Sequence, residues 1–226
     1  MTRVEIKEKA KSSLEGKRGN AALFLFIAII IFLPVNILLS LIPFVGPLLK
    51  IVLSAIFTLS ITVFIISLCN SNEKLSFKEG IPSSNLIIKS IVVTFLFSLI
   101  IFLAMLPAIF FMVISFFLNS VGLLVITSIL LFLFALFIQF PMIFLNYIII
   151  DNPNASIGFI ITETFKITFK NLKRIIVMSL SLILWNLLIG ITFGLAYFYV
   201  RPYIISIYYF MYKDIIEENK ILNLEK

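Results

Sequence analysis

The sequence predicts an all-α integral membrane protein with about six transmembrane helices and two amphipathic helices in the cytoplasmic interface. Of its 226 residues, 62% are hydrophobic and only 13% are charged, whereas soluble domains are about 45–50% apolar and about 25% charged. Long uncharged segments alternate with short polar breaks, and the charged residues gather in breaks that would share one side of a membrane. A soluble fold of this length could not bury so much apolar surface, so lipid must be the solvent for most of the chain.

The chain opens with a segment, residues 2–15, that we expect to form a short amphipathic helix. Thr2 and Glu5 have the spacing of a capping box, in which each side chain binds the backbone of the other. The apolar stripe of this helix would consist of Ile6, Ala10 and Leu14.

The first two spans are predicted at 20–42 and 47–69. Residues 20–42 carry no charge and reach about 34 Å as a helix, which is enough for a hydrocarbon core of about 30 Å. Two prolines and a glycine at 43–47 separate the two spans. The polar segment 70–85 then forms the first cytoplasmic loop.

The third and fourth spans are predicted at 89–118 and 121–146. Pro107 lies inside the third, where a proline usually kinks a membrane helix without ending it. Asp151–Asn154 stops the hydrophobic pattern after the fourth. The oxygens of this segment could form a ligand cluster, but we favour a turn that caps the next helix.

Residues 155–172 are predicted to form the second amphipathic helix, lying in the cytoplasmic interface. Apolar residues recur at spacings of four, four, four and three, and they are Ile157, Ile161, Phe165, Phe169 and Leu172. The opposite face carries Glu163, Lys166, Lys170 and Lys173.

Two further spans complete the predicted bundle, at 175–195 and 199–212, and 213–226 would be a charged cytoplasmic tail. Every basic residue except Lys50 and Arg201, and all 11 acidic residues, then fall on the cytoplasmic side. This asymmetry predicts that both termini are cytoplasmic. The heavy use of Ile, Phe, Lys and Asn is typical of an AT-rich bacterial genome, so we expect a multi-pass protein of a bacterial plasma membrane.

The two ends of the chain are similar to one another. Each has an amphipathic helix, a Lys-Arg pair, a span, a Gly/Pro break and a second span. This similarity has two explanations, a parallel internal repeat or coincidence, and one sequence does not separate them.

The distribution of ionisable residues argues against catalysis. The chain has no histidine, and its carboxylates all fall in the predicted cytoplasmic segments. General-base chemistry, intramembrane aspartyl chemistry and metal binding therefore lack their usual residues, so we expect no enzyme, no cofactor and no metal site. The same absence weighs against ion-coupled transport. Basic residues flank apolar spans instead of forming a polar face, which excludes nucleic acid as a partner.

Two groups of polar residues are candidates for a site. Amides inside the predicted spans could line a polar path, although holding helices together is their commoner role, and they are Asn36, Gln139, Asn146 and Asn186. The sixth span offers a lipid or ligand contact made of Arg201, Tyr199, Tyr203, Tyr208 and Tyr212. We expect Arg201 at the outer interface because a helix of about 14 residues could not carry it deep. An aromatic belt and simple anchoring of Arg201 are the plainer explanations.

Four stretches carry a resemblance to a known family. They are EKAKSSLEGKRGNAALF at the start, NEKLSFKEG in the first loop, IIIDNPNASIGFIITETFKITFKNLKRI, and ITFGLAYFYVRPYIISIYYFMYKDI at the end. On these the chain resembles the bacterial membrane proteins of domain-of-unknown-function family 975 over nearly its whole length. The resemblance implies a multispan architecture and no particular activity.

Two functions remain open on these grounds. The first is a non-catalytic membrane protein that acts through contacts with membrane lipids, or with a membrane or cytoplasmic protein. The second is a transporter, or a transporter accessory, for a hydrophobic or amphipathic compound, including self-protection against a membrane-active peptide. A continuous polar path through the bundle would favour the second.

Overall fold

A computed structural model describes residues 1–71, 73, 75–118 and 120–224, with the side chains of 135–139 and 220–224 left out of the description. This part of the chain is helical and contains no strand, which confirms the all-α class. The helices are α1 Arg3–Ser13, α2 Arg18–Ser40, α3 Val45–Asn70, the short η1 Phe77–Gly80, α4 Ser84–Phe117, α5 Val121–Gln139, α6 Met142–Asp151, α7 Ile157–Lys170, α8 Leu172–Leu180, α9 Ile183–Ile191 and α10 Tyr197–Leu224.

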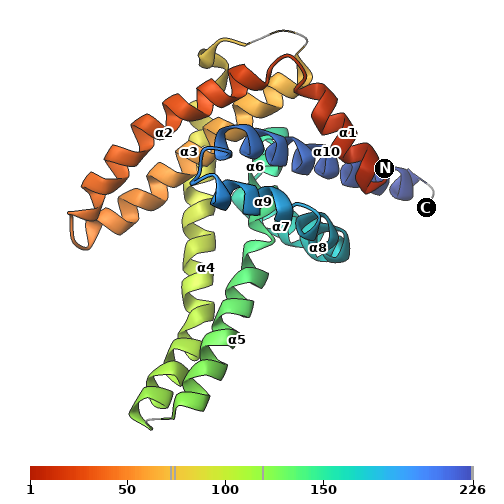
Figure 1. The fold of residues 1–226 in the computed structure, drawn as a ribbon. Helices are drawn as coiled ribbons and strands as arrows, with labels where there is room; N and C mark the ends of the chain where they lie inside the picture. The colour runs from red at the N-terminus through yellow and green to blue at the C-terminus, as the bar shows by residue number, and fades with distance from the viewer. Residues whose placement is uncertain (72, 74, 119, 225–226) are drawn as a thin grey trace.

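Two helical hairpins, α2–α3 and α4–α5, diverge from a body that contains the other helices (Figure 1). Helix α10 runs through this body and packs against α1, α2, α3, α6 and α9. The N-terminus lies near the C-terminal end of α10 (Figure 1).

Four segments of the described chain are long and apolar enough to cross a membrane, and they are Arg18–Ser40, Val45–Asn70, Phe77–Phe117 and Leu172–Ile191. They contain or largely overlap the spans expected at 20–42, 47–69, 89–118 and 175–195. Large apolar side chains on them are open, including Leu38 at 61% and Leu184 at 76% of their full exposure. Such surface is stable only against lipid, so the protein is a membrane protein.

The fourth, fifth and sixth expected spans take a different form from the expectation. Residues 121–146 are divided between α5 and α6, because the chain turns at Phe140–Pro141 and proline cannot continue the hydrogen-bond ladder. Residues 199–212 belong to α10, which continues as a helix through most of the expected tail. Residues 175–195 are also interrupted, at the turn between α8 and α9.

Helix α1 has the capping box that the sequence predicts. The Thr2 hydroxyl accepts from the Glu5 backbone N–H, and the Glu5 carboxylate accepts from the Thr2 backbone N–H. The expected apolar stripe is fully buried, and it consists of Ile6, Ala10 and Leu14. Because α1 packs against α10 and α3, this stripe contacts the protein itself.

Helix α7 is amphipathic, but its buried face is rotated from the predicted stripe. The most buried residues are Ile160, Thr164, Ile167 and Thr168. Thr164 fits this face because its hydroxyl donates to the Ile160 carbonyl oxygen. Phe165 is half-buried and stacks on Phe97 of α4, with 5.3 Å between ring centroids.

Residues 151–154 lie at the turn before α7, as expected, but they do not supply the cap of that helix. The Ser156 hydroxyl accepts from the Phe159 backbone N–H and so caps α7. The carbonyl oxygens of Pro153 and Ala155 accept from Lys89 of α4. These contacts give the turn a structural role, so no ligand is needed to account for its oxygen atoms.

A glycine permits the close approach at the tip of the first hairpin. A Cβ atom at Gly46 would lie 2.0 Å from the Leu39 carbonyl oxygen, so no larger residue fits there without moving the backbone. The α2–α3 hairpin is therefore closed by Gly46 as well as by the two flanking prolines.

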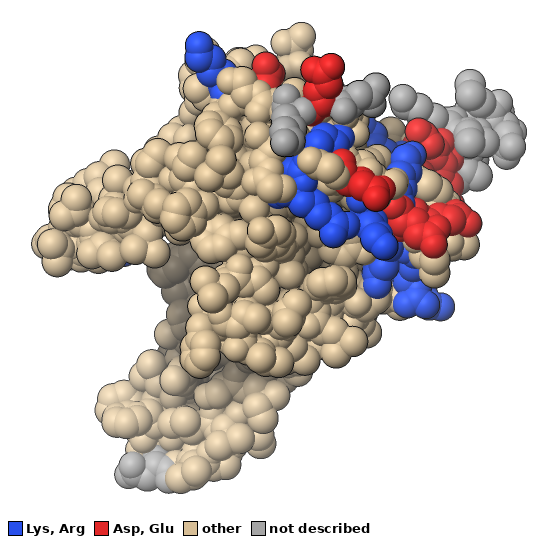
Figure 2. All heavy atoms as spheres, turned by 45° about the horizontal axis from the view of Figure 1, so that its top comes forward, with Lys and Arg blue, Asp and Glu red and all other residues tan. Residues whose placement is uncertain are grey.

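The charged residues gather at one end of the molecule, over α1, α8 and the C-terminal part of α10, while the two hairpins are almost free of them on the face shown (Figure 2). Ion pairs there link the N-terminus, α8 and α6 to α10. The N-terminal ammonium and the Arg174 guanidinium both bind the Asp214 carboxylate, and Lys213 binds Asp151 at 2.7 Å. Segregation of charge from apolar helices is the pattern that a membrane imposes.

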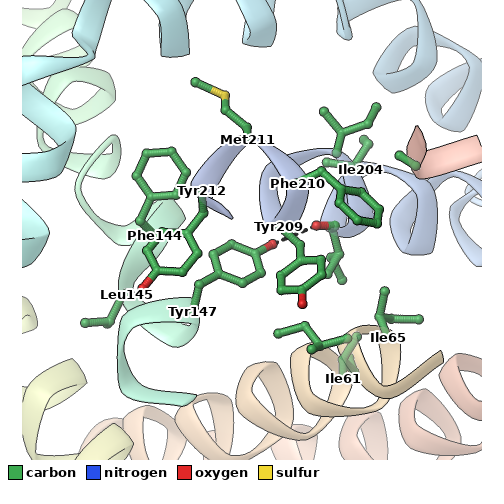
Figure 3. Close-up of a cluster of buried hydrophobic side chains, with 14 of the residues drawn as sticks. Ile61, Ile65, Phe144, Leu145, Tyr147, Ile204, Tyr209, Phe210, Met211 and Tyr212 are labelled. Carbon is green, nitrogen blue, oxygen red and sulfur yellow. Dashed lines mark hydrogen bonds between the residues drawn. The ribbon is translucent and has the colours of Figure 1, made fainter. Parts of the chain in front are cut away.

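An aromatic core joins α10 to α6 and α3 (Figure 3). The Tyr212 ring stacks on Tyr147 at 5.9 Å and lies 6.1 Å from Phe144. The Tyr147 hydroxyl donates to the Ile205 carbonyl oxygen at 2.9 Å (Figure 3). This core holds α6 in register with α10, and the two helices then share a pocket.

Candidate functional site

A polar pocket of about 270 Å³ lies where α3, α4, α6 and α10 meet, and we call it the Arg201 pocket. Its polar lining is made of Ser54, Thr58, Thr62, Thr94, Asn146, Tyr147, Arg201 and Tyr208. Apolar residues of α3, α6 and α10 complete the walls. None of the described residues that line the pocket is acidic.

The pocket hydroxyls of α3 come from one face of that helix. Ser54, Thr58 and Thr62 recur every four residues, so their side chains lie one above another. Each of them donates to a carbonyl oxygen of its own helix, with Thr58 to Ser54 at 2.8 Å and Thr62 to Thr58 at 2.7 Å. Their oxygens remain available to accept hydrogen bonds from a bound molecule.

The unused donors of the pocket are Arg201, Asn146 and Thr94. Among the described residues, none of these three side chains has a hydrogen bond or an ion pair with another group of the protein. Tyr208, in contrast, shares a hydrogen bond with Ser179 at 2.9 Å. Three free donors, one of them a permanent cation, face a space without a carboxylate, so the pocket is suited to an anion.

The pocket lies beside the middle of α3, since Thr58 is close to the midpoint of Val45–Asn70. The placement of Arg201 at the outer interface stays a prediction, but the reason given for it changes. The expectation assumed a short last helix, whereas α10 extends from Tyr197 to Leu224 and brings Arg201 against α3 and α6.

The predicted contact residues divide into three groups in the structure. Arg201 and Tyr208 share the pocket, since a spacing of seven places them on one face of α10. Tyr199 and Tyr203 lie on another face and line a separate groove. Tyr212 is buried in the aromatic core and is 2% exposed.

The predicted intrabundle amides are not brought together. Asn146 lines the Arg201 pocket, whereas Asn36 lies on α2 and Asn186 on α9, which contribute nothing to that pocket. The side chain of Gln139 is outside the described residues. The described amides therefore do not form a continuous polar path with one another.

Sequence reasoning missed the pocket residues Ser54, Thr58, Thr62, Thr94 and Tyr147. Serine and threonine are common in membrane helices because they satisfy their hydroxyls on their own backbone, so single ones carry little information. The spacing of four from Ser54 to Thr62 is the signal that indicates a shared face.

The described residues contain no group of three or more histidine, cysteine, aspartate or glutamate side chains that could hold a metal ion. The pocket's own groups can hold an anion through a guanidinium, an amide and hydroxyls.

The fold and the pocket define a class, a helical membrane protein with an arginine-containing polar pocket among its helices. The chain belongs to the family described as protein of unknown function (DUF975), whose model matches residues 1–219. No curated protein and no solved structure matches it.

Proposed function

We propose that this protein is a non-catalytic membrane protein that binds an anionic amphiphile, with its phosphate or carboxylate group held by Arg201. The observation that carries the proposal is the guanidinium of Arg201, which has no anionic partner among the described residues and lies beside the middle of a membrane helix. An arginine at the centre of a membrane helix costs about 2.5–3.5 kcal/mol on the insertion scale, so an arginine among membrane helices needs polar partners. A bound anion offsets this cost through charge-assisted hydrogen bonds.

The walls of the pocket support an amphiphile over a free ion. Ile143, Leu145 and Ile204 line it next to the polar groups, so a bound molecule would contact apolar and polar surface together. A small hydrated anion gains nothing from the apolar walls, whereas an acyl or aromatic tail does.

The separation of the amides favours binding over transport. A transporter for an amphipathic compound would need polar groups along a route, and Asn36 and Asn186 lie on helices away from the pocket. The second candidate function is transport of the bound amphiphile, either as cargo or as self-protection against a membrane-active peptide. One arm of the test addresses it.

The test is binding to the purified full chain in a neutral detergent. The probes are a short-chain phosphatidic acid, the corresponding phosphatidylcholine and inorganic phosphate. We expect the phosphatidic acid to bind best and Arg201→Gln to weaken it by about 10-fold or more, because a hydrogen bond to a charged group is worth about 1.5–3 kcal/mol. Lys50→Gln is the matched control, since Lys50 donates to Ser40 in the α2–α3 hairpin and lies outside the pocket.

Three results would contradict the proposal. Equal binding of the phosphatidylcholine would show that the negative charge is not recognised. Equal binding of inorganic phosphate would show that the tail has no part in recognition. Loss of binding in Lys50→Gln to the same degree as in Arg201→Gln would reduce the effect to net charge. Arg201-dependent passage of the phosphatidic acid across proteoliposomes would support the transport function.

A further inference from the structure

A second groove, separate from the Arg201 pocket, lies between α1, the start of α2, α9 and α10, and has a volume of about 460 Å³. We call it the Trp185 groove. The residues that set its chemistry are Lys11, Arg18, Trp185, Leu188, Tyr199 and Tyr203. No described residue lines both cavities.

The cations of the groove come from the charged end of the molecule. Lys11 lies on α1 and Arg18 begins α2, and both are exposed. Neither side chain has an ion pair or hydrogen bond with another described residue, and none of the described lining residues is acidic. Two free cations beside one groove attract a phosphate group.

Aromatic and aliphatic side chains line the rest of the groove. Leu188 of α9 lines it, and its neighbours on α9 are open, with Ile191 at 74% of its full exposure. The Trp185 ring meets Tyr203 edge-on at 5.5 Å. Tryptophan and tyrosine place an apolar ring next to a polar atom, which suits the boundary between a lipid headgroup and its chains.

We infer that the Trp185 groove binds an anionic phospholipid of the surrounding bilayer, with its phosphate between Lys11 and Arg18 and an acyl chain along Leu188 and Trp185. The lining combines cations, aromatic rings and aliphatic side chains, which are the partners that the phosphate, the headgroup boundary and the acyl chains of such a lipid need. A peptide or soluble partner would have to cover the open face of α9, which lies against lipid in a membrane protein. This site does not depend on the function proposed for Arg201.

The experiment measures lipid retention by the purified full chain in mixed micelles of neutral detergent. The probes are phosphatidylglycerol and phosphatidylcholine with the same acyl chains. We expect preference for phosphatidylglycerol, and the double variant Lys11→Gln/Arg18→Gln to weaken it by about 10-fold or more, because each basic residue near a lipid surface contributes about a five-fold factor.

The control variant is Lys78→Gln/Lys173→Gln, which makes the same change in net charge on exposed residues outside the groove. A second variant, Ala196→Phe, fills the groove while both cations remain. We expect it to reduce phosphatidylglycerol binding, and a gel-filtration profile and thermal unfolding confirm that each variant is folded.

Each result either supports or overturns the inference. Unchanged binding in the Lys11→Gln/Arg18→Gln variant, or an equal loss in the control, would show that no phosphate site exists at these cations. Full binding in Ala196→Phe would show that the acyl chain does not enter the groove. Competition by glycerol phosphate as strong as by the lipid would identify a small-anion site instead.

Discussion

The Nζ atom of Lys17 donates to the carbonyl oxygen of Leu68 at 2.6 Å. It also donates to the carbonyl oxygen of Ser71 at 2.7 Å, and Lys17 is only 8% exposed. Leu68 is in the last turn of α3, where carbonyl groups lack partners within the helix and the helix dipole is negative. The sequence predicts Lys17 to flank the first span on the cytoplasmic side. The structure shows that Lys17 also caps the C-terminal end of the second span, α3.

Replacing Lys17 by methionine should destabilise the protein by about 1–3 kcal/mol, because one buried and one partly buried carbonyl group lose a charged donor. Thermal unfolding of the purified protein in detergent measures the effect. Lys78→Met is the control, since Lys78 is exposed on η1 and should have almost no effect. Equal stability of the two variants would show that the Lys17 contacts contribute nothing.

The second prediction concerns the pH dependence of stability at Asp214. Burial raises the pKa of this carboxyl, but hydrogen bonds from Arg174 and the N-terminal ammonium outweigh burial, so the pKa lies below its ordinary value of 3.8. A lowered pKa means that the ionised form is favoured in the folded state. Its contribution is present above pH 3.8 and is lost as the pH falls through the lower pKa of the folded protein.

Asp214→Asn should therefore lower stability at pH 7 and reduce the further loss between pH 5 and the acid limit. Arg174→Gln should act in the same direction, because it removes one of the two partners. Thermal unfolding in detergent at a series of pH values gives both quantities. A wild-type and an Asp214→Asn curve that stay parallel across the acid range would contradict the assignment.

The third prediction is the orientation in the membrane. In a Cys69→Ser background, a cysteine at Asn154 should be shielded from an impermeant reagent in intact cells, and one at Ser120 should react. The basis is that the charged residues gather at one end of the molecule, with the tip of the α4–α5 hairpin directed away from it (Figures 1 and 2). The reverse labelling pattern would show that the protein has the opposite orientation in the membrane.

The fourth prediction tests the packing of α7. Phe165→Asp should expose Lys166 and Lys170 to protease in inverted vesicles, because a carboxylate would replace a ring that stacks on Phe97 of α4. Thr162→Asp adds the same charge at an exposed position of α7 and should leave cleavage unchanged. If both variants resist protease as the wild type does, the α7–α4 contact does not hold the helix.

The sequence predicts local structure better than it predicts how helices meet. The stripe Ile6, Ala10 and Leu14 follows from helix periodicity and is buried as expected. On α7 the same periodicity predicts the wrong buried face. The pattern treats Thr164 as polar, although its hydroxyl is satisfied within the helix.

Prediction of the Arg201 pocket from the sequence meets the same limit. Arg201, Tyr208 and Asn146 were each identified from their chemistry, but their juxtaposition depends on how α6 packs on α10. That packing is set by contacts between residues far apart in the chain, such as Tyr147 and Ile205. Periodicity within one helix carries no information about them.

The final prediction separates a guanidinium-specific role of Arg201 from simple charge. Lysine keeps the positive charge and the reach, but it lacks the planar fork that binds two oxygens of a phosphate or carboxylate at once. We expect Arg201→Lys to be expressed and folded like the wild type, and to bind short-chain phosphatidic acid several-fold more weakly. Arg201→Ala should lose both the charge and the fork and bind most weakly, with Lys50→Ala as the control for loss of a cation outside the pocket. Wild-type affinity in Arg201→Lys would assign Arg201 the role of a simple charge, and wild-type affinity in Arg201→Ala would remove it from the site.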